Sequence, residues 1–334
     1  MVMVGSRPGP LGALVLVWLT ACGPVVEPGP AAWVTPSLGA DVFIGPGGAR
    51  PLRVWAAADP RAVMLALHGF NDYSNAFAAP AAWWAEQGIT TYAYDQVGFG
   101  GAASAGRWHG TAALVADLCV AARLVQERHP ATPLYLLGES MGGAVILVAA
   151  GGSVCPALRP AGIVLAAPAV WGRETMSPFY QAALWLGAHL APGVRVTGRG
   201  LGITPSDNRA MLQALAADPL VIKETRVDAV HGIVDLMDEA LARIPSVRLP
   251  SLVLYGAHDE IIPPAPTRVM LARWTGRPRF AYYRDGYHML LRDLQAETVW
   301  RDIAAWLRDA RAPLPSGADI GGVQAFTNGG PSKS

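Results

Sequence analysis

Charged side chains are scarce in this chain of 334 residues: Asp, Glu, Lys and Arg make up 15% of it, against about 25% in a typical soluble domain. The 26 basic and 25 acidic residues nearly cancel, and no block of five or more like charges occurs. Because nucleic-acid-binding surfaces need clustered Lys and Arg, we expect no nucleic acid as a partner. With 52% hydrophobic residues, the composition also excludes disorder of the chain as a whole.

Patterns typical of metal binding are missing as well. The seven histidines and three cysteines form neither a His-x-x-x-His pair nor a Cys/His cluster, so we expect no metal. Gly and Pro are numerous, at 37 and 28, but they follow no Gly-X-Y period and the chain shows no internal repeat. Collagen-like and repeat architectures are therefore excluded.

The N-terminus has the features of an export signal. Leu11–Leu19 is an apolar run, too short to cross a hydrocarbon core of about 30 Å but typical of the middle of a signal peptide. It leads into Leu19-Thr-Ala-Cys22-Gly23, which resembles the lipobox of bacterial lipoproteins. We predict a signal peptide over residues 1–21, lipidation of Cys22 and anchoring of the exported protein to a membrane of the bacterial cell envelope. The alternative is an ordinary secretory signal with an incidental cysteine.

The ends of the mature chain and its other two cysteines are less informative. Residues 22–48, which begin rich in Pro, Gly and Ala, are predicted to be a tether and N-terminal segment, and residues 313–334 a disordered tail. In an exported protein Cys119 and Cys155 can be oxidised to a disulfide. We favour the alternative of two buried free thiols, since unpaired cysteines are common in protein cores.

From residue 52 onward, short apolar runs alternate with helix-like segments, which predicts a mostly parallel sheet flanked by helices, an α/β fold. The predicted strands are Leu52–Ala56, Ala62–Leu67, Ile89–Tyr94, Leu134–Leu137, Ile163–Ala166, Ser251–Tyr255 and Arg279–Tyr283. The predicted helices are Ala78–Glu86, Thr111–Arg128, Gly142–Ala150, Pro266–Trp274 and Leu294–Arg308.

One long interval, residues 171–250, interrupts the alternation and is too long for a simple connection. Its helical stretches are Pro178–Leu190, Asn208–Ala216 and Val227–Arg243. They predict a helical cap, inserted after the sixth core strand between the core segments 49–170 and 251–312. We predict that Phe179 and Trp185 line an apolar entrance and that His231 contacts substrate. The alternative is that the aromatic residues form the buried face of their helix.

The strand at Leu134 runs into Gly138-Glu-Ser140-Met-Gly142 and then directly into a helix. A serine at such a junction lies on a sharp, strained turn that exposes its hydroxyl at the carboxyl edge of the sheet, and Gly138 and Gly142 leave room for it. Ser140 is therefore the predicted nucleophile. The alternative is a turn of small residues that packs a helix against the sheet.

A serine nucleophile needs a base, and the base needs an acid that fixes its tautomer. Asp259 follows the strand Ser251–Tyr255, and His288 follows the last predicted strand. Both are expected at the sheet edge where Ser140 emerges, in the order Ser, Asp, His of the hydrolase fold. Glu260 is the alternative acid.

Another histidine follows the strand Ala62–Leu67. We predict that His68, in Leu67-His68-Gly69-Phe70, has a structural role and holds this loop. The backbone N–H groups of Phe70 and Met141 are then the predicted oxyanion donors.

Together these motifs resemble the α/β-hydrolase fold, and within it the monoacylglycerol lipase and lysophospholipase-like branch, whose sequences are also grouped with the serine aminopeptidases. The resemblance covers residues 54–307 and rests on LHGF (67–70), DQVGFG (95–100), GESMGG (138–143), GAHDEIIPP (256–264) and DGYH (285–288). It implies Ser140, Asp259 and His288 as the triad, and Asp95 with its glycines as a structural turn near the sheet edge. It also implies a cap that controls lipid access.

The chain departs from this branch at two points. Glu139 stands where many of its lipases have His, a variant that resembles lysophospholipase-like and plant-esterase-like members, and the Asp95 turn lacks a frequent Arg. We predict a cofactor-free carboxylic ester hydrolase that acts on monoacylglycerol or lysophospholipid through an acyl-enzyme. The alternatives are a short-chain carboxylesterase, a non-catalytic lipid-binding protein and a prolyl-type aminopeptidase. The aminopeptidase would need an acidic patch in the cap to hold a substrate ammonium, for which the chain offers Glu224, Asp228, Asp235, Asp238 and Glu239.

Overall fold

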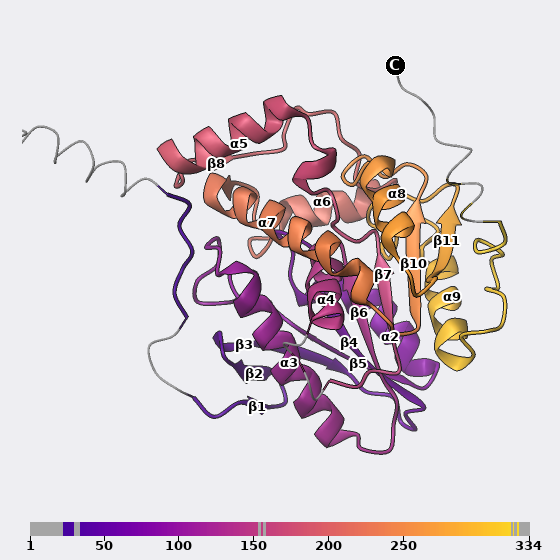
Figure 1. Cartoon of the computed structure of the whole chain (residues 1–334). Coiled ribbons are helices and arrows are strands. Elements are labelled where there is room, and N and C mark those ends of the chain that lie inside the picture. Colours follow the sequence, from indigo (N-terminus) through magenta and orange to yellow (C-terminus); the bar gives the residue numbers. More distant parts are fainter. Residues whose placement is uncertain are drawn as a thin grey trace, which may run out of the picture.

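The computed structural model describes residues 23–29, 34–152, 155, 158–321, 323 and 326. Its centre is a nine-stranded sheet in the order β1-β2-β3-β5-β4-β6-β7-β10-β11 (Figure 1). The strands are β1 Ser37–Leu38, β2 Val42–Gly45, β3 Gly48–Trp55, β4 Ala62–Leu67, β5 Ile89–Tyr94, β6 Leu134–Glu139, β7 Gly162–Ala166, β10 Ser251–Gly256 and β11 Arg279–Tyr283. The pairs from β1 to β5 along this order are antiparallel, and those from β5 to β11 are parallel.

The apolar strand runs become central strands because helices cover both faces of the sheet. Every residue of β4, β5 and β10 is buried, as expected for parallel strands between two helical layers. The helices of the core are α2 Ala78–Glu86, α3 Gly110–Arg128, α4 Met141–Gly151, α8 Pro264–Arg273 and α9 Ala296–Arg308, with the short helix η1 Ser74–Phe77 before α2. The apolar side chains of α3, α4 and α8 share one core cluster, and those of α2 and α9 share the other. The predicted α/β fold is confirmed.

The interval 171–250 is a mainly helical insertion that follows β7, the sixth strand of at least four residues. It contains η2 Arg173–Thr175, α5 Pro178–Leu190, β8 Arg195–Val196, α6 Arg209–Ala217, β9 Thr225–Arg226, α7 Val227–Arg243 and η3 Ile244–Ser246. Figure 1 shows α5, α6 and α7 gathered at one end of the sheet. The apolar face of α7 belongs to the core cluster of α3 and α4, so this helix joins the cap to the core.

The tether that opens residues 22–48 stays a prediction, whereas the N-terminal segment that follows it contains β1, β2 and the start of β3, which form the antiparallel edge of the sheet. Phe43 of β2 is fully buried and its ring packs 4.8 Å from that of Tyr94, measured between centroids. The Glu27 N–H also donates to the Trp108 carbonyl at 2.7 Å. Short strands between glycines gave no alternating pattern, and one buried aromatic residue anchors them. The predicted signal peptide and Cys22 lie outside the described residues.

The predicted disordered tail is wrong for residues 313–321 and for Phe326. Leu314 and Phe326 are 3% and 2% exposed, and the Ser316 N–H donates to the buried Asp302 of α9 at 3.0 Å. The Tyr282 N–H of the edge strand β11 donates to the Ala318 carbonyl at 2.9 Å. The segment is ordered because it satisfies an otherwise open sheet edge and fills gaps beside it with isolated apolar side chains.

The two described cysteines form a disulfide between Cys119 of α3 and Cys155, whose Cα atoms lie 5.5 Å apart. The favoured interpretation of two free thiols is therefore wrong: the fold places Cys155 against α3, which sequence spacing does not reveal. Within the described part of the chain, no helix combines the length and the apolar character that crossing a membrane requires.

Candidate active site

Ser140 lies between β6 and α4 in a backbone conformation that L-residues rarely adopt, with φ of +51° and ψ of −113°. Such a conformation costs on the order of 1–3 kcal/mol and persists only where the surroundings enforce it. Here they do, because a Cβ on Gly142 would lie 2.1 Å from the Leu67 carbonyl oxygen, and one on Gly138 would lie 2.4 Å from the Gly143 nitrogen. The two glycines thus permit the close packing of β6, α4 and β4 that forces the turn.

His288 and Asp259 are hydrogen-bonded at the same edge of the sheet. His288 Nδ1 lies 2.9 Å from Asp259 Oδ2, and because a carboxylate only accepts, Nδ1 is the donor. The other oxygen, Asp259 Oδ1, accepts the N–H groups of Ile261 and Ile262, both at 2.9 Å. Both side chains are nearly buried, so the pair is shielded from water and fixed in orientation.

Electrostatics favour a basic imidazole at this position. Burial by itself lowers the pKa of His288, and Arg292 adds to that effect. The charge and hydrogen bond of Asp259, with a contribution from Glu139, outweigh both and raise the pKa above its ordinary value. His288 is therefore within electrostatic reach of Glu139, the residue directly before Ser140.

The residues 68–73 after β4, which we call the oxyanion loop, pack against the serine. A Cβ on Gly69 would lie 3.4 Å from the Ser140 Cβ, in ordinary contact distance. Met141 is the first residue of α4, where backbone N–H groups have no partner within the helix. The loop and this helix start thus both adjoin Ser140.

The fully buried His68 is tied to its own loop and to the neighbouring one. Its Nδ1 donates to the Gly69 carbonyl at 2.8 Å, and its Nε2 accepts the Gln96 N–H at 2.9 Å. Burial lowers the pKa of His68, in keeping with a neutral ring that donates at one nitrogen and accepts at the other. Asp95, also fully buried, accepts the N–H groups of Ser74 at 3.0 Å and of Gly101 at 2.8 Å.

Contacts with the cap hold both flanking loops. Asn71 Nδ2 donates to Thr225 Oγ1 at 2.6 Å, and the Tyr73 hydroxyl donates to Asp218 Oδ2 at 2.6 Å. On the other side, residues 284–295, which we call the base loop, carry His288. The Ser206 hydroxyl donates to Asp293 in this loop at 2.6 Å. No local sequence pattern indicates these contacts, because each joins residues far apart in the chain.

The cap residues predicted to bind substrate lie differently. Phe179 and Trp185 are 76% and 55% exposed, which excludes the alternative of a buried helix face. Trp185 and His231 line a small cavity with Arg173, and within the described residues none of Ser140, Asp259 and His288 lines it. Their role in substrate binding stays a prediction.

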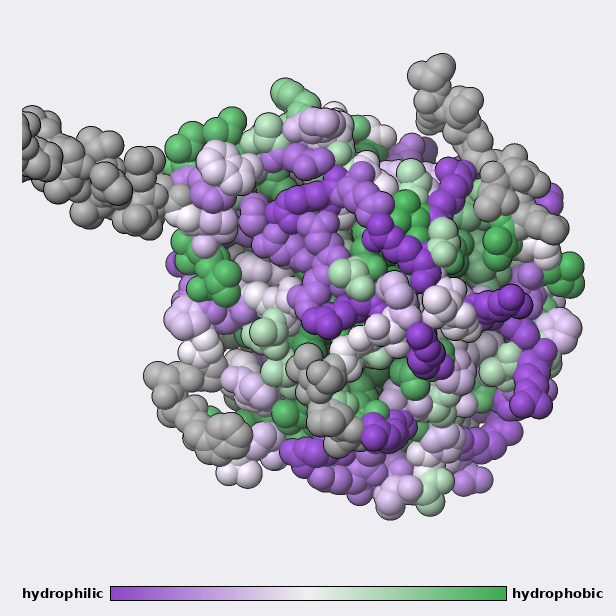
Figure 2. Space-filling model, viewed as in Figure 1, coloured by the Kyte–Doolittle hydropathy of each residue, from purple (hydrophilic) through white to green (hydrophobic). Residues whose placement is uncertain are grey.

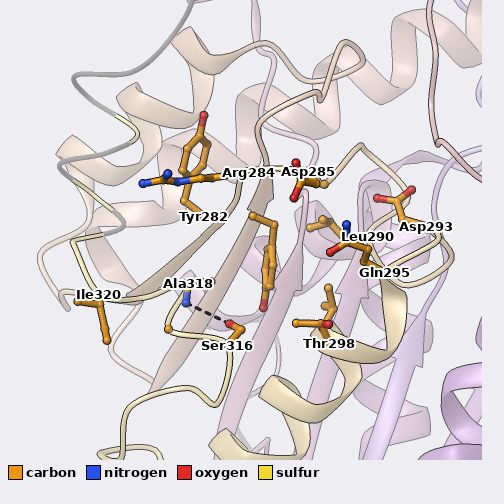
Figure 3. A pocket seen from close by; sticks show the side chains of 14 residues that line it. Tyr282, Arg284, Asp285, Leu290, Asp293, Gln295, Thr298, Ser316, Ala318 and Ile320 are labelled. Carbon is orange, nitrogen blue, oxygen red and sulfur yellow. Dashed lines mark hydrogen bonds between the residues drawn. The ribbon is translucent and has the colours of Figure 1, made fainter.

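Two larger cavities border the base loop. One, of about 400 Å³, lies between β11, the start of α9 and residues 316–320; Figure 3 shows Asp285, Asp293 and Thr298 around it. The other, of about 460 Å³, lies between α6 and α9 and is lined by Asp72 and Arg292 together with apolar Met211, Leu215 and Trp300. The second cavity therefore reaches the two charged residues that border the catalytic edge.

A serine on a strained strand-to-helix turn, with an Asp–His pair at the carboxyl ends of β10 and β11, defines an α/β-hydrolase. The family model of the serine aminopeptidases, S33, matches residues 58–295, and the chain belongs to this family.

Curated relatives extend over most of the chain. The chain is 27% identical over 271 residues to a monoacylglycerol lipase of Mycolicibacterium smegmatis, and this alignment covers 79% of this chain and 95% of that protein. It is 24% identical over 277 residues to the human monoglyceride lipase, covering 78% and 87%.

Solved structures confirm the fold. A soluble variant of the Saccharomyces cerevisiae monoglyceride lipase superposes with a TM-score of 0.69 at 20% identity, covering 86% of this chain and 99% of that one. The monoacylglycerol lipase of Paleococcus ferrophilus gives a TM-score of 0.63 at 22% identity, covering 77% and 98%.

Proposed function

We propose that the protein is a cofactor-free serine hydrolase of carboxylic esters, which acts on monoacylglycerols or lysophospholipids. The observation that carries this proposal is the buried Asp259–His288 pair at the sheet edge that presents Ser140. Because Asp259 holds the Nδ1 proton, Nε2 of His288 is the free basic nitrogen of the ring.

In the proposed reaction, His288 Nε2 takes the proton of the Ser140 hydroxyl while the hydroxyl oxygen attacks the ester carbonyl carbon. The carbonyl oxygen becomes an oxyanion, which the backbone N–H groups of Phe70 and Met141 stabilise. The oxyanion collapses, the bond to the alcohol breaks, and His288 donates the proton to the leaving oxygen. Water, deprotonated by His288, then attacks the acyl-enzyme; the acid is released and the proton returns to Ser140.

Two observations support a lipid ester as substrate. The relatives that match over most of their length are named monoacylglycerol or monoglyceride lipases. The cavity beside Asp72 and Arg292 has an apolar wall of Met211, Leu215 and Trp300 and, at about 460 Å³, the volume of a typical small-ligand pocket.

A prolyl-type aminopeptidase is disfavoured by the pairing of the cap acids. It would need a free carboxylate for the substrate ammonium, but Asp228 pairs with Arg226, and Asp235 and Asp238 both pair with Arg173. Glu239 pairs with Arg243 at 3.3 Å. Of the five cap acids considered for this role, four are thus paired with arginines, Asp235 and Asp238 with the same one.

We also propose that the protein is exported and anchored through a lipid at Cys22. The disulfide between Cys119 and Cys155 supports export, since structural disulfides persist in oxidising compartments. The exposed apolar side chains of the cap support contact with a membrane; they include Phe179, Tyr180, Trp185, Leu186 and Leu190 of α5. Figure 2 shows hydrophobic residues on the upper surface, where Figure 1 places α5 and β8. Metabolic labelling with a fatty acid, compared between the full chain and Cys22→Ala, tests the anchor: label on both proteins or on neither contradicts it.

The activity is tested with purified protein that begins at Cys22, with Ser140→Ala as the blank. We expect hydrolysis of monoolein or lysophosphatidylcholine, and labelling by a fluorophosphonate that Ser140→Ala abolishes. Turnover of short p-nitrophenyl esters alone would indicate a carboxylesterase, and turnover of proline p-nitroanilide a peptidase. No turnover and no label would contradict the enzyme assignment.

A further inference from the structure

A buried cluster of three charges lies beside the catalytic residues. Arg292 Nη2 is 2.7 Å from Asp72 Oδ2 and 3.1 Å from Glu139 Oε2. The exposed fractions of the side chains are 10% for Arg292, 7% for Asp72 and 2% for Glu139. Moving charged side chains out of water costs free energy unless the charges are paired. These three side chains pair with one another, so the cluster is a fixed part of the site.

Each member of the cluster belongs to a different part of the proposed machinery. Asp72 is in the oxyanion loop, two residues after Phe70, and its N–H donates to the Gly69 carbonyl at 3.3 Å. Glu139 directly precedes Ser140 at the end of β6. Arg292 is in the base loop, four residues after His288, and its N–H donates to the Met289 carbonyl at 2.8 Å. One guanidinium nitrogen therefore joins the three segments that must keep a common geometry during ester hydrolysis.

Further contacts hold Arg292 itself in place. Its carbonyl accepts Asn208 Nδ2, at the start of α6, at 3.0 Å, and the next residue, Asp293, accepts the Tyr287 N–H at 2.8 Å. The base loop is thus braced on both sides of His288. Because the base loop is held in place, the Arg292 guanidinium fixes the positions of Asp72 and Glu139 and does not move with them.

We propose that Arg292 is a positioning residue for the ester hydrolysis proposed above, on which this inference rests: through Asp72 and Glu139 it holds the oxyanion loop, Ser140 and the base loop in register. Loss of this link misplaces the oxyanion donors relative to the nucleophile. A misplacement of about 1 Å costs on the order of 100-fold in rate without comparable loss of substrate binding. The expected signature is a fall in kcat with KM nearly unchanged.

Glu139 has a second effect that a purely structural link lacks. The groups that face His288 are Asp259 and Glu139, which raise its pKa, and Arg292, which lowers it. Replacing Glu139 by Gln keeps an acceptor for Arg292 and removes the negative charge. The pKa of His288 then falls, the neutral base persists to lower pH, and the acid limb of kcat/KM moves to lower pH.

The test compares wild type with five variants on p-nitrophenyl butyrate, one of which is the Glu139→Gln variant described above. Arg292→Met leaves two buried carboxylates without a cation and is expected to fold poorly. The triple variant Asp72→Asn/Glu139→Gln/Arg292→Met carries no buried charge in the cluster and keeps the proposal falsifiable. Arg292→Lys restores one cationic donor and is expected to lose less kcat than the triple variant. Arg273→Met is the matched control, since Arg273 forms an exposed pair with Glu174 away from the site.

We expect the folded triple variant to lose about 10- to 100-fold in kcat with KM within about threefold of wild type, and Arg273→Met to match wild type. Thermal unfolding checks that each variant is folded. An active wild type together with a triple variant of unchanged kcat overturns the positioning role and leaves the hydrolase intact. If the acid limb of kcat/KM lies at the same pH in Glu139→Gln as in wild type, the charge effect on His288 is overturned. A wild type with neither turnover nor fluorophosphonate label overturns both proposals.

Discussion

Two helices of this molecule begin with a serine and continue with an apolar sequence, yet they serve opposite purposes. At the start of α5, Ser177 has an ordinary extended backbone and its hydroxyl accepts the Tyr180 N–H at 3.3 Å. At the start of α4, Ser140 has a positive φ and its hydroxyl caps no helix N–H. Nine of the eleven residues of α4 are buried, whereas α5 buries only Ala188 among thirteen.

A serine followed by an apolar helix therefore does not by itself identify a nucleophile or a core helix. The hydroxyl of Ser177 is engaged in capping, while glycines on both sides force Ser140 into a turn that leaves its hydroxyl available. Burial is decided by neighbours: β4 and α7 cover α4, and nothing among the described residues covers the outer face of α5.

The largest difference is expected between the two serines. Ser140→Ala should lower kcat by about 10⁴–10⁶ because the nucleophile is lost, with little change in stability since no cap bond is removed. Ser177→Ala should keep kcat and lose about 1 kcal/mol of unfolding free energy, the usual value of a helix cap. Steady-state kinetics and urea unfolding of both variants measure this, and a Ser140→Ala enzyme with appreciable turnover would remove the basis of the contrast.

The next difference concerns the helix bodies. Leu147 of α4 is fully buried, so Leu147→Ala should lower the unfolding free energy by about 2–5 kcal/mol through lost burial and a cavity. Leu186 of α5 is 49% exposed, and Leu186→Ala should change it by no more than about 0.5 kcal/mol. If both variants lose the same unfolding free energy in urea, Leu186 of α5 is covered in solution.

Activity at the start of α4 should also depend on pH through His288. Its pKa is raised above 6.5, and only the neutral ring accepts the Ser140 proton, so kcat/KM should fall as the pH decreases through that raised value. The decrease is about tenfold per pH unit on the acid side. Asp259→Asn no longer fixes the tautomer and should lower kcat by about 10⁴; because it also removes the charge that raises the pKa of His288, the limb of its residual activity should lie at lower pH. A wild-type limb below pH 6.5 would contradict this account.

The smallest effect is expected from the exposed face of α5. Tyr180 and Leu190 are 57% and 68% exposed, and replacing both by Ser should weaken binding to phospholipid vesicles by roughly three- to tenfold. Ile320→Ser is the control, since Ile320 is 75% exposed but lies outside the cap. If both proteins sediment equally with vesicles, the α5 face is not the membrane contact.

The sequence predicts the parts of the fold that have local signals. β4 and β5 match their predicted ranges, because each is an apolar run between turn residues. The positions of Ser140, Asp259 and His288 after predicted strands follow from the parallel topology, which brings the carboxyl ends of strands to one edge.

What could not be predicted depends on contacts between distant residues. Arg292 is one arginine among many in the sequence, and only the fold places it against Asp72 and Glu139. Phe326 is an isolated aromatic residue in a polar tail, yet it packs against the rings of Tyr255 and Phe280. Neither residue has a periodic pattern around it, so no local rule identifies them.

The disulfide affects the stability of the chain segment that carries the active-site serine. Cys119 and Cys155 are 36 residues apart, and Ser140 lies between them, so the proposed nucleophile belongs to a closed covalent ring. In the chain-entropy model, a ring of this size restricts the unfolded chain by about 4 kcal/mol. Protein produced in a reducing cytoplasm lacks that restriction, so the choice of expression compartment should decide how much of the enzyme survives heating.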